Sequence, residues 1–134
     1  MDKQEIQALM REVFPQIGEG WEITHQDDEK LTLRLAVSDS HLRPGGTVSG
    51  PTMFALADLA MYFAILSKIG PKLLSVTTGL NINFMRKPTG PAIYGDARIL
   101  KMGKSLAVGD VTIYNEGEDA PVAHAQVTYS IPKD

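Results

Sequence analysis

Residues 51–66 (PTMFALADLAMYFAIL) form a run of sixteen residues in which Asp58 is the single charged residue. A membrane-spanning helix needs roughly 18 or more consecutive apolar residues, so this interrupted run is too short for one. It predicts instead a buried helix of a globular domain. Because burial of a carboxylate is costly, Asp58 must be paired, hydrogen-bonded or turned toward a cleft.

Residues typical of helix ends flank this run. Ser49 and Gly50 are favourable N-cap residues, and Pro51 suits the first helical turn, where its missing N–H is not needed. Gly70 then ends the helix. A helix that is apolar nearly all round must be covered nearly all round. We therefore expect a sheet wrapped about it or a partner chain packed against it.

The composition favours one globular domain over residues 1–134. Of the 134 residues, 43% are hydrophobic, which is enough apolar material for a core. The formal net charge is −3 and no run of Lys or Arg occurs. Neither nucleic acid nor a membrane is therefore expected as a partner.

The residue types that usually hold metals or form disulfides are scarce. The chain has no cysteine, which excludes disulfides, Cys-ligated zinc and a Cys nucleophile. Its histidines, His25, His41 and His124, are far apart in the sequence and match no metal-ligand spacing, so no metal site is expected. Residues 1–14 contain no signal-peptide core, which predicts a cytoplasmic protein.

Periodicity predicts the other elements. Apolar side chains at three- and four-residue spacings in residues 3–14 predict a short amphipathic helix, which packs on the outside of the domain within residues 1–18. Alternation between turn residues predicts strands at residues 21–25, 30–37, 73–85, 92–102, 106–115 and 121–131. This order predicts an α+β fold, with a strongly curved antiparallel sheet around one long helix.

Alternation also predicts which faces of two strands are buried. In residues 30–37 leucines alternate with Thr32 and Arg34, which predicts one buried and one wet face. In the later strand the side chains expected to face inward are those of Leu80, Ile82 and Phe84, with Asn81 and Asn83 facing outward.

Four segments resemble one protein family. Residues 41–58 (HLRPGGTVSGPTMFALAD) are similar to the hotdog-fold acyl-CoA thioesterases, in which a loop H-x-N-x-x-G-x-x-H-G-G leads into a helix with L-A-D. Residues 77–88 (TTGLNINFMRKP), the Gly95-Asp96 pair and the turn at residues 103–105 also resemble family counterparts. The likeness is strongest to the phenylacetate-degradation, or PaaI-like, branch and covers nearly the whole chain after the first helix.

The resemblance implies a hotdog fold that hydrolyses an acyl-CoA thioester to a carboxylic acid and coenzyme A, without metal or redox cofactor. It implies that Asp58 is the base or nucleophile and that the N–H of Gly50 donates to the oxyanion. Thr77 would hold the attacking water, and Ser49 would hydrogen-bond beside them. In this fold two chains pair with continuous sheets. A homodimer, or a homotetramer of two dimers, would then form each site between Gly50 of one subunit and Asp58 of the other.

A second group of residues is expected to contact the substrate. Its members are Arg43, Pro51, Asn81, Arg86, Lys104 and Ser105. The cations among them would attract the phosphates of coenzyme A. The resemblance implies an aromatic or a short- to medium-chain acyl group.

Three residues depart from the family pattern. Ser49 stands where the family usually has His, Pro51 where it has a second Gly, and Arg43 where it has Asn. Pro51 removes one N–H from the helix entrance but leaves that of Gly50. The permanent charge of Arg43 would either stabilise the Asp58 carboxylate or meet an acidic acyl group.

Two alternatives share these residues. The hydratase branch of the fold uses D-x-N-x-x-H, whereas Asp58 is followed by LAMYF without a His, which argues against a hydratase. A non-catalytic acyl-CoA binding module is the other alternative, since Ser49 and Arg43 replace polar site residues of the family.

Overall fold

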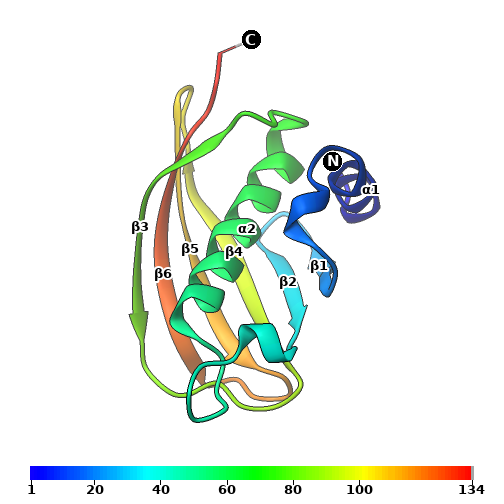
Figure 1. The fold of residues 1–134 in the computed structure, drawn as a ribbon. Helices are drawn as coiled ribbons and strands as arrows, with labels where there is room; N and C mark the ends of the chain where they lie inside the picture. The colour runs from blue at the N-terminus through cyan, green and yellow to red at the C-terminus, as the bar shows by residue number, and fades with distance from the viewer. Residues whose placement is uncertain (134) are drawn as a thin grey trace.

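The computed structural model describes residues 1–133, and Asp134, the last residue of the predicted domain, lies outside them. One six-stranded antiparallel sheet curves around a long helix (Figure 1). The elements are α1 (Lys3–Val13), η1 (Pro15–Ile17), β1 (Trp21–Gln26), β2 (Leu31–Ala36), η2 (Asp39–His41), α2 (Gly50–Ile69), β3 (Val76–Phe84), β4 (Ala92–Met102), β5 (Leu106–Asn115) and β6 (Pro121–Ser130). The sheet order is β1-β2-β4-β5-β6-β3. The predicted α+β hotdog fold is confirmed.

The long helix α2 begins and ends where the sequence predicts. The Ser49 hydroxyl accepts a hydrogen bond from the N–H of Thr52 at 3.3 Å and so caps the first turn. At the other end Gly70 has φ of 86°, a left-handed conformation that favours glycine. Between these ends, residues 60–66 are all buried.

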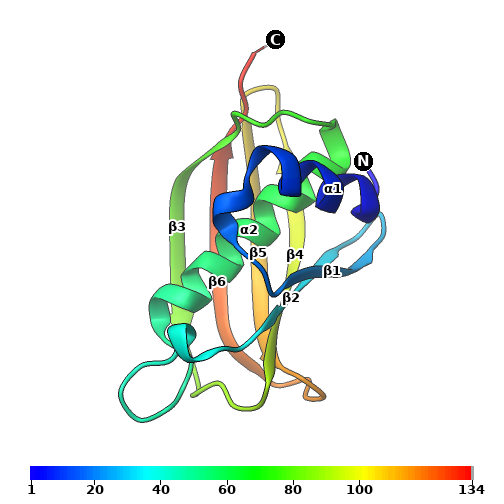
Figure 2. The ribbon, with the colours of Figure 1, turned by 45° about the vertical axis from the view of Figure 1, so that its right-hand side comes forward.

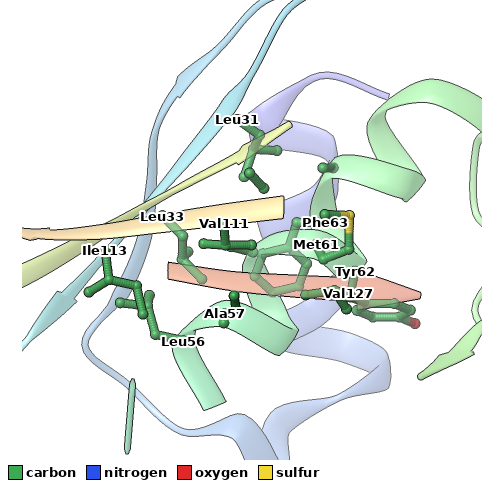
Figure 3. Close-up of a cluster of buried hydrophobic side chains, with 14 of the residues drawn as sticks. Leu31, Leu33, Leu56, Ala57, Met61, Tyr62, Phe63, Val111, Ile113 and Val127 are labelled. Atoms are coloured by element: carbon green, nitrogen blue, oxygen red, sulfur yellow. The ribbon is translucent and has the colours of Figure 1, made fainter. Parts of the chain in front are cut away.

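By length and composition α2 could cross a membrane, with a mean hydropathy of 1.5. However, 56% of its most apolar 18-residue window is buried inside the fold. Figure 3 shows side chains of α2, including Leu56 and Met61, among those of the strands. The sheet thus covers much of the apolar surface of this helix, as expected of a core helix, although Phe54 is 42% exposed.

Two strand glycines let α2 approach the sheet closely. A Cβ at Gly109 would lie 2.3 Å from the main-chain oxygen of Arg98 and 2.4 Å from Cε of Met61. A Cβ at Gly95 would lie 3.3 Å from Cγ of Leu56. Met61 and Leu56 belong to α2, so the absence of a side chain at the two glycines determines the depth at which the helix lies.

The first helix, α1, lies across α2 and beside β1 (Figures 1 and 2). Its buried side chains are those of Ile6 and Met10. The side-chain oxygen of Gln7 accepts the N–H of Ile23 in β1 at 2.6 Å. The main-chain oxygen of Ser67 in α2 accepts a hydrogen bond from the amino terminus at 3.0 Å. α1 is therefore held by side-chain packing and by polar contacts with both neighbours.

Two expectations about strand faces need correction. Thr32 is 5% exposed rather than wet, because its hydroxyl donates at 2.7 Å to Asp96, whose Oδ1 also accepts the hydroxyl of Tyr114 at 2.9 Å. Leu80 and Ile82 are partly buried against the core as predicted, but Phe84 is 52% exposed. Phe84 lies at the end of an edge strand, where there is little to cover it.

β3 also starts later than the predicted strand at residues 73–85. Residues 73–75 form a turn instead, in which the N–H of Leu73 donates to Pro71 at 2.9 Å and that of Ser75 to Lys72 at 3.0 Å.

We expect Gly109→Ala to lower the free energy of unfolding by about 2 kcal/mol, because the added methyl group must displace Met61 and a strand backbone. Gly79→Ala is the matched control, since nothing lies within 4 Å of a Cβ there. Urea unfolding of both variants and the natural protein, at one protein concentration, measures the difference. Equal losses for the two substitutions would contradict the close approach of α2.

Candidate active site

Asp58 lies on α2 where the helix faces the start of β3 and the end of β6. Its Oδ1 accepts the hydroxyl of Thr77 at 2.5 Å and that of Tyr129 at 2.6 Å. The Tyr129 hydroxyl also lies 3.0 Å from the main-chain oxygen of Asp58. Both side-chain bonds reach Oδ1, so the carboxylate is held in one orientation, and Oδ2 has no hydrogen-bond partner among residues 1–133.

A β-bulge turns Thr77 toward Asp58. Thr77 pairs with Tyr129, and Gly79 pairs with the very next residue of β6, Thr128, so Thr78 is the extra residue. Without this shift the alternation of β3 would place Thr78, not Thr77, on the inner face opposite Tyr129. The hydroxyl of Thr78 instead donates to the main chain of Thr128 at 3.3 Å.

Tyr129, which the sequence analysis did not single out, is the second donor to Asp58. Its ring is 3% exposed and stacks on Tyr62, with centroids 6.1 Å apart and 18° between the planes. Burial, and then the hydrogen bond to the Asp58 carboxylate, raise the pKa of Tyr129 far above its usual range. The phenol therefore stays protonated and remains a donor. Alternation places residue 129 on the inner face of β6, but no pattern indicates its partner.

A cavity of about 470 Å³ opens beside Asp58. Its lining is largely apolar and consists of Val13, Phe14, Leu59, Tyr62, Leu73, Leu74, Ser75, Val76, Thr77 and Tyr129 in addition to Asp58. The Ser75 side chain is 5% exposed, and its hydroxyl finds no hydrogen-bond partner within residues 1–133. The cavity therefore combines apolar walls with one fixed carboxylate and one unused hydroxyl.

The start of α2 forms a second group of predicted residues. The Ser49 hydroxyl accepts the N–H of Thr52, and the main-chain carbonyl of Ser49 accepts the N–H of Met53 at 3.1 Å. The ring of Phe84 lies against Gly50, 3.4 Å from where a Cβ would be. Gly50 is eight residues before Asp58, or about 12 Å along the helix axis. Within one chain, therefore, the Gly50 N–H and the Asp58 carboxylate do not meet at one reacting atom.

The predicted substrate contacts fall into separate places. Arg43 is exposed in the loop before α2. The side chain of Arg86 donates to Pro121 at 3.0 Å, at the start of β6. The β4–β5 turn, with Lys104 and Ser105, lies at the far end of β6, where the Ser105 main chain accepts the N–H of Ile131 at 2.8 Å.

Asn81 and Pro51 complete these predicted contacts. Asn81 is paired opposite Gln126 on the outer face of the sheet, away from α2. Pro51 occupies the first turn of α2 and is exposed. The structure thus brings Asp58 and Thr77 together and gathers Ser49, Gly50 and Pro51 elsewhere. No hydrogen bond joins the other predicted contacts to Asp58 within residues 1–133, although the turn with Lys104 and Ser105 lies at the same end of β6 as Tyr129.

Within residues 1–133, no group of three or more His, Cys, Asp or Glu side chains could hold a metal ion. His25 instead lies 2.6 Å from Asp27, and His124 lies 2.9 Å from Asp110. His41 accepts the N–H of Ser38 at 3.0 Å in the loop before α2.

The sequence profile of the thioesterase superfamily matches residues 45–122, more than half of the chain, including both α2 and β3. The chain belongs to the thioesterase superfamily. Membership makes thioester hydrolysis its class of reaction and confirms the family expected from the four segments.

Individual members of this superfamily are similar over most of their length. A presumptive thioesterase of Silicibacter sp. TM1040 is 49% identical, with 99% of this chain and 93% of that chain covered and a TM-score of 0.91. A presumptive esterase of Pseudomonas aeruginosa, PA0474, is 29% identical over 113 residues, 80% of each chain. The PaaI protein from the phenylacetic acid degradation operon of E. coli is 22% identical, with 97% and 92% covered and a TM-score of 0.82, and therefore shows the shared fold.

We expect Asp58→Asn to lower the pKa of Tyr129, because the substitution removes the anion that raises it. In the natural protein the folded-state pKa of Tyr129 lies above the unfolded value near 10.0, so the protonated phenol favours the folded state. That stabilisation is complete below about pH 10 and declines as the pH rises toward the folded-state pKa.

Absorbance titration of the phenolate, with each protein compared with its Tyr129→Phe counterpart, measures this pKa. Tyr114 is the internal control, because its hydroxyl donates to Asp96 at 2.9 Å and does not touch Asp58. An unchanged Tyr129 titration in Asp58→Asn would contradict the pairing.

Proposed function

We propose that this thioesterase-superfamily protein hydrolyses acyl-CoA, so that acyl-CoA and water give a carboxylic acid and coenzyme A, with Asp58 as base or nucleophile. The observation that carries the proposal is the Asp58 carboxylate, fixed through Oδ1 and open to a largely apolar cavity of about 470 Å³. Acyl pockets of this size and lining suit small aromatic or short- to medium-chain groups.

The free oxygen of Asp58 is suited to either role. As a base, Oδ2 takes a proton from water while the water oxygen attacks the thioester carbonyl. As a nucleophile, Oδ2 attacks that carbonyl itself, coenzyme A leaves as the thiolate, and water then cleaves the anhydride. Thr77 donates its proton to Oδ1, so its oxygen lone pairs remain free to accept a hydrogen bond from the water. Tyr129 holds the carboxylate as a positioning residue.

A partner chain supplies the oxyanion donor in this proposal. Two observations support a homodimer, or a homotetramer of two dimers. The first is the separation of about 12 Å between Gly50 and Asp58 along α2, which one chain cannot close. The second is β3, an edge strand with exposed apolar side chains at its ends, namely Val76 at 56% in the strand and Leu74 at 77% and Met85 at 52% next to it. Pairing of two β3 strands would cover these and bring the helix entrance of one subunit to Asp58 of the other.

Exposed cations are the proposed contacts for the phosphates of coenzyme A. Arg43 and Arg86 lie at the end of the sheet that holds the helix entrance, and Lys104 lies at the other end. Arg43 carries a further role toward an acidic acyl group. Asn81 faces the outer surface of the sheet, so we leave it out of the proposed site. We further propose a cytoplasmic location and a reaction without metal or redox cofactor.

We expect Asp58→Asn to lower the rate of coenzyme A release by ~10² or more, as when a catalytic base or nucleophile is lost. The assay uses a panel of phenylacetyl-, benzoyl-, short- and medium-chain acyl-CoA thioesters and detects the free thiol. Full activity of Asp58→Asn would overturn the role of Asp58. Binding of acyl-CoA without turnover on any thioester would replace the enzyme with the non-catalytic binding module.

Tyr129→Phe tests the positioning role in the same assay. The variant loses one hydrogen bond to Oδ1 and keeps the ring, so we expect kcat to fall by about tenfold with KM nearly unchanged. Tyr114→Phe is the matched control, because it removes a tyrosine hydroxyl that donates to Asp96 at 2.9 Å and does not line the Asp58 cavity. Equal effects of the two substitutions would reduce Tyr129 to a structural residue.

Mixed dimers test whether two chains share each site. Gly50→Pro removes the N–H of Gly50, whereas Gly50→Ala keeps it and meets only the end of the Phe84 ring at 3.4 Å. Co-expression of Asp58→Asn and Gly50→Pro chains under different tags, with purification through both, gives dimers that hold one intact site. We expect up to about half of the natural activity per dimer, although each parent is inactive. No recovery above the parents would contradict a shared site.

A further inference from the structure

A second cavity lies next to the Asp58 cavity, between α1, η1 and β1. Its volume is about 660 Å³, and its floor consists of the buried side chains of Ile6, Met10, Ile23, Leu33 and Phe63. Of the described residues, Phe14 alone lines both cavities.

Phe14 lines both cavities because of its position at the end of α1. Phe14 ends α1, where its N–H donates to Met10 at 2.9 Å, and the chain then turns into η1. On the opposite side the consecutive α2 residues Tyr62 and Phe63 line one cavity each, with ring centroids 5.9 Å apart. Figure 3 shows these two side chains on the same stretch of α2. Phe14, which is 37% exposed, is thus the side chain at the border between the Asp58 cavity and the second cavity.

The buried floor of the second cavity suits an alkyl chain, whereas its rim is polar. The side-chain oxygen of Gln7 already accepts the N–H of Ile23 at 2.6 Å, and the indole N–H of Trp21 donates to Ile17 at 2.9 Å. The charged lining residues, Arg11, Glu19 and Glu22, are exposed at the rim. The floor of the cavity is thus formed by apolar side chains, which offer a ligand no hydrogen bond.

We propose that Phe14 ends the acyl pocket and sets the longest acyl group that the protein accepts, and that the second cavity is the space into which a longer chain extends once this ring is removed. The inference rests on the proposed function, since it takes the Asp58 cavity as the acyl pocket. Phe14 is then a specificity-determining residue. Each further CH₂ group that enters the second cavity would tighten binding by up to about fourfold.

The test compares kcat/KM for straight-chain acyl-CoA thioesters of about 4 to 16 carbons. We expect Phe14→Ala to move the optimum of kcat/KM to longer chains by about four carbons or more. Ile17→Ala is the matched control, because Ile17 lines only the second cavity, so its truncation leaves the Phe14 wall intact and the optimum in place. In the double variant Phe14→Ala with Ile17→Trp, the indole refills the second cavity and restores the short-chain optimum.

Two further measurements keep the inference separate from the proposed function. Phe14→Leu, a milder truncation, should give a smaller shift in the same direction if Phe14→Ala does not fold. If the natural protein hydrolyses no thioester, the proposed function fails, and calorimetric binding of S-alkyl-CoA thioethers of the same lengths then tests Phe14 directly. The same chain-length preference with and without the Phe14 ring, in either assay, would overturn the inference.

Discussion

The close packing of α2 into the concave face of the sheet is the constraint on which the rest of the structure depends. A helix with apolar residues on all sides gains nothing by facing water, and the curved sheet, together with α1, covers much of it. Gly95 and Gly109 remove two side chains where Leu56 and Met61 approach, so the helix has one depth and one rotation against the strands. The position of every residue on α2, including Asp58, follows from that fit.

Asp58 couples this packing to the chemistry. A carboxylate on a core helix is tolerated only with donors close by, and here they come from two strands, Thr77 on β3 and Tyr129 on β6. Both hydroxyl groups donate to Oδ1 of Asp58. The hydrogen bonds that stabilise the carboxylate on this helix therefore also determine that Oδ2 is the oxygen that faces the cavity. The stability of the fold and the orientation of the reacting group therefore rest on the same two hydroxyl groups.

Local patterns in the sequence were sufficient for the order of elements and for the caps of α2, because Ser49, Gly70 and the alternation of the strands act over a few residues. The features that build the site are non-local. The bulge at Thr78, which turns Thr77 toward Asp58, depends on how β3 pairs with β6, and the role of Tyr129 depends on the place of Asp58 on α2. The burial of Thr32 could not be predicted for the same reason. It comes from side chains of β4 and β5 that lie more than 60 positions away in the sequence.

The edge position of β3 has a consequence for local stability. Thr77 sits near the beginning of a strand that is hydrogen-bonded to β6 on one side only, within the part of a sheet that opens at the lowest free-energy cost. Fraying of these few residues would release the Asp58 carboxylate while the core around α2 stays folded. A second chain paired along the open side of β3 would raise the cost of this opening, so that assembly would protect the orientation of Asp58 as well as complete the site.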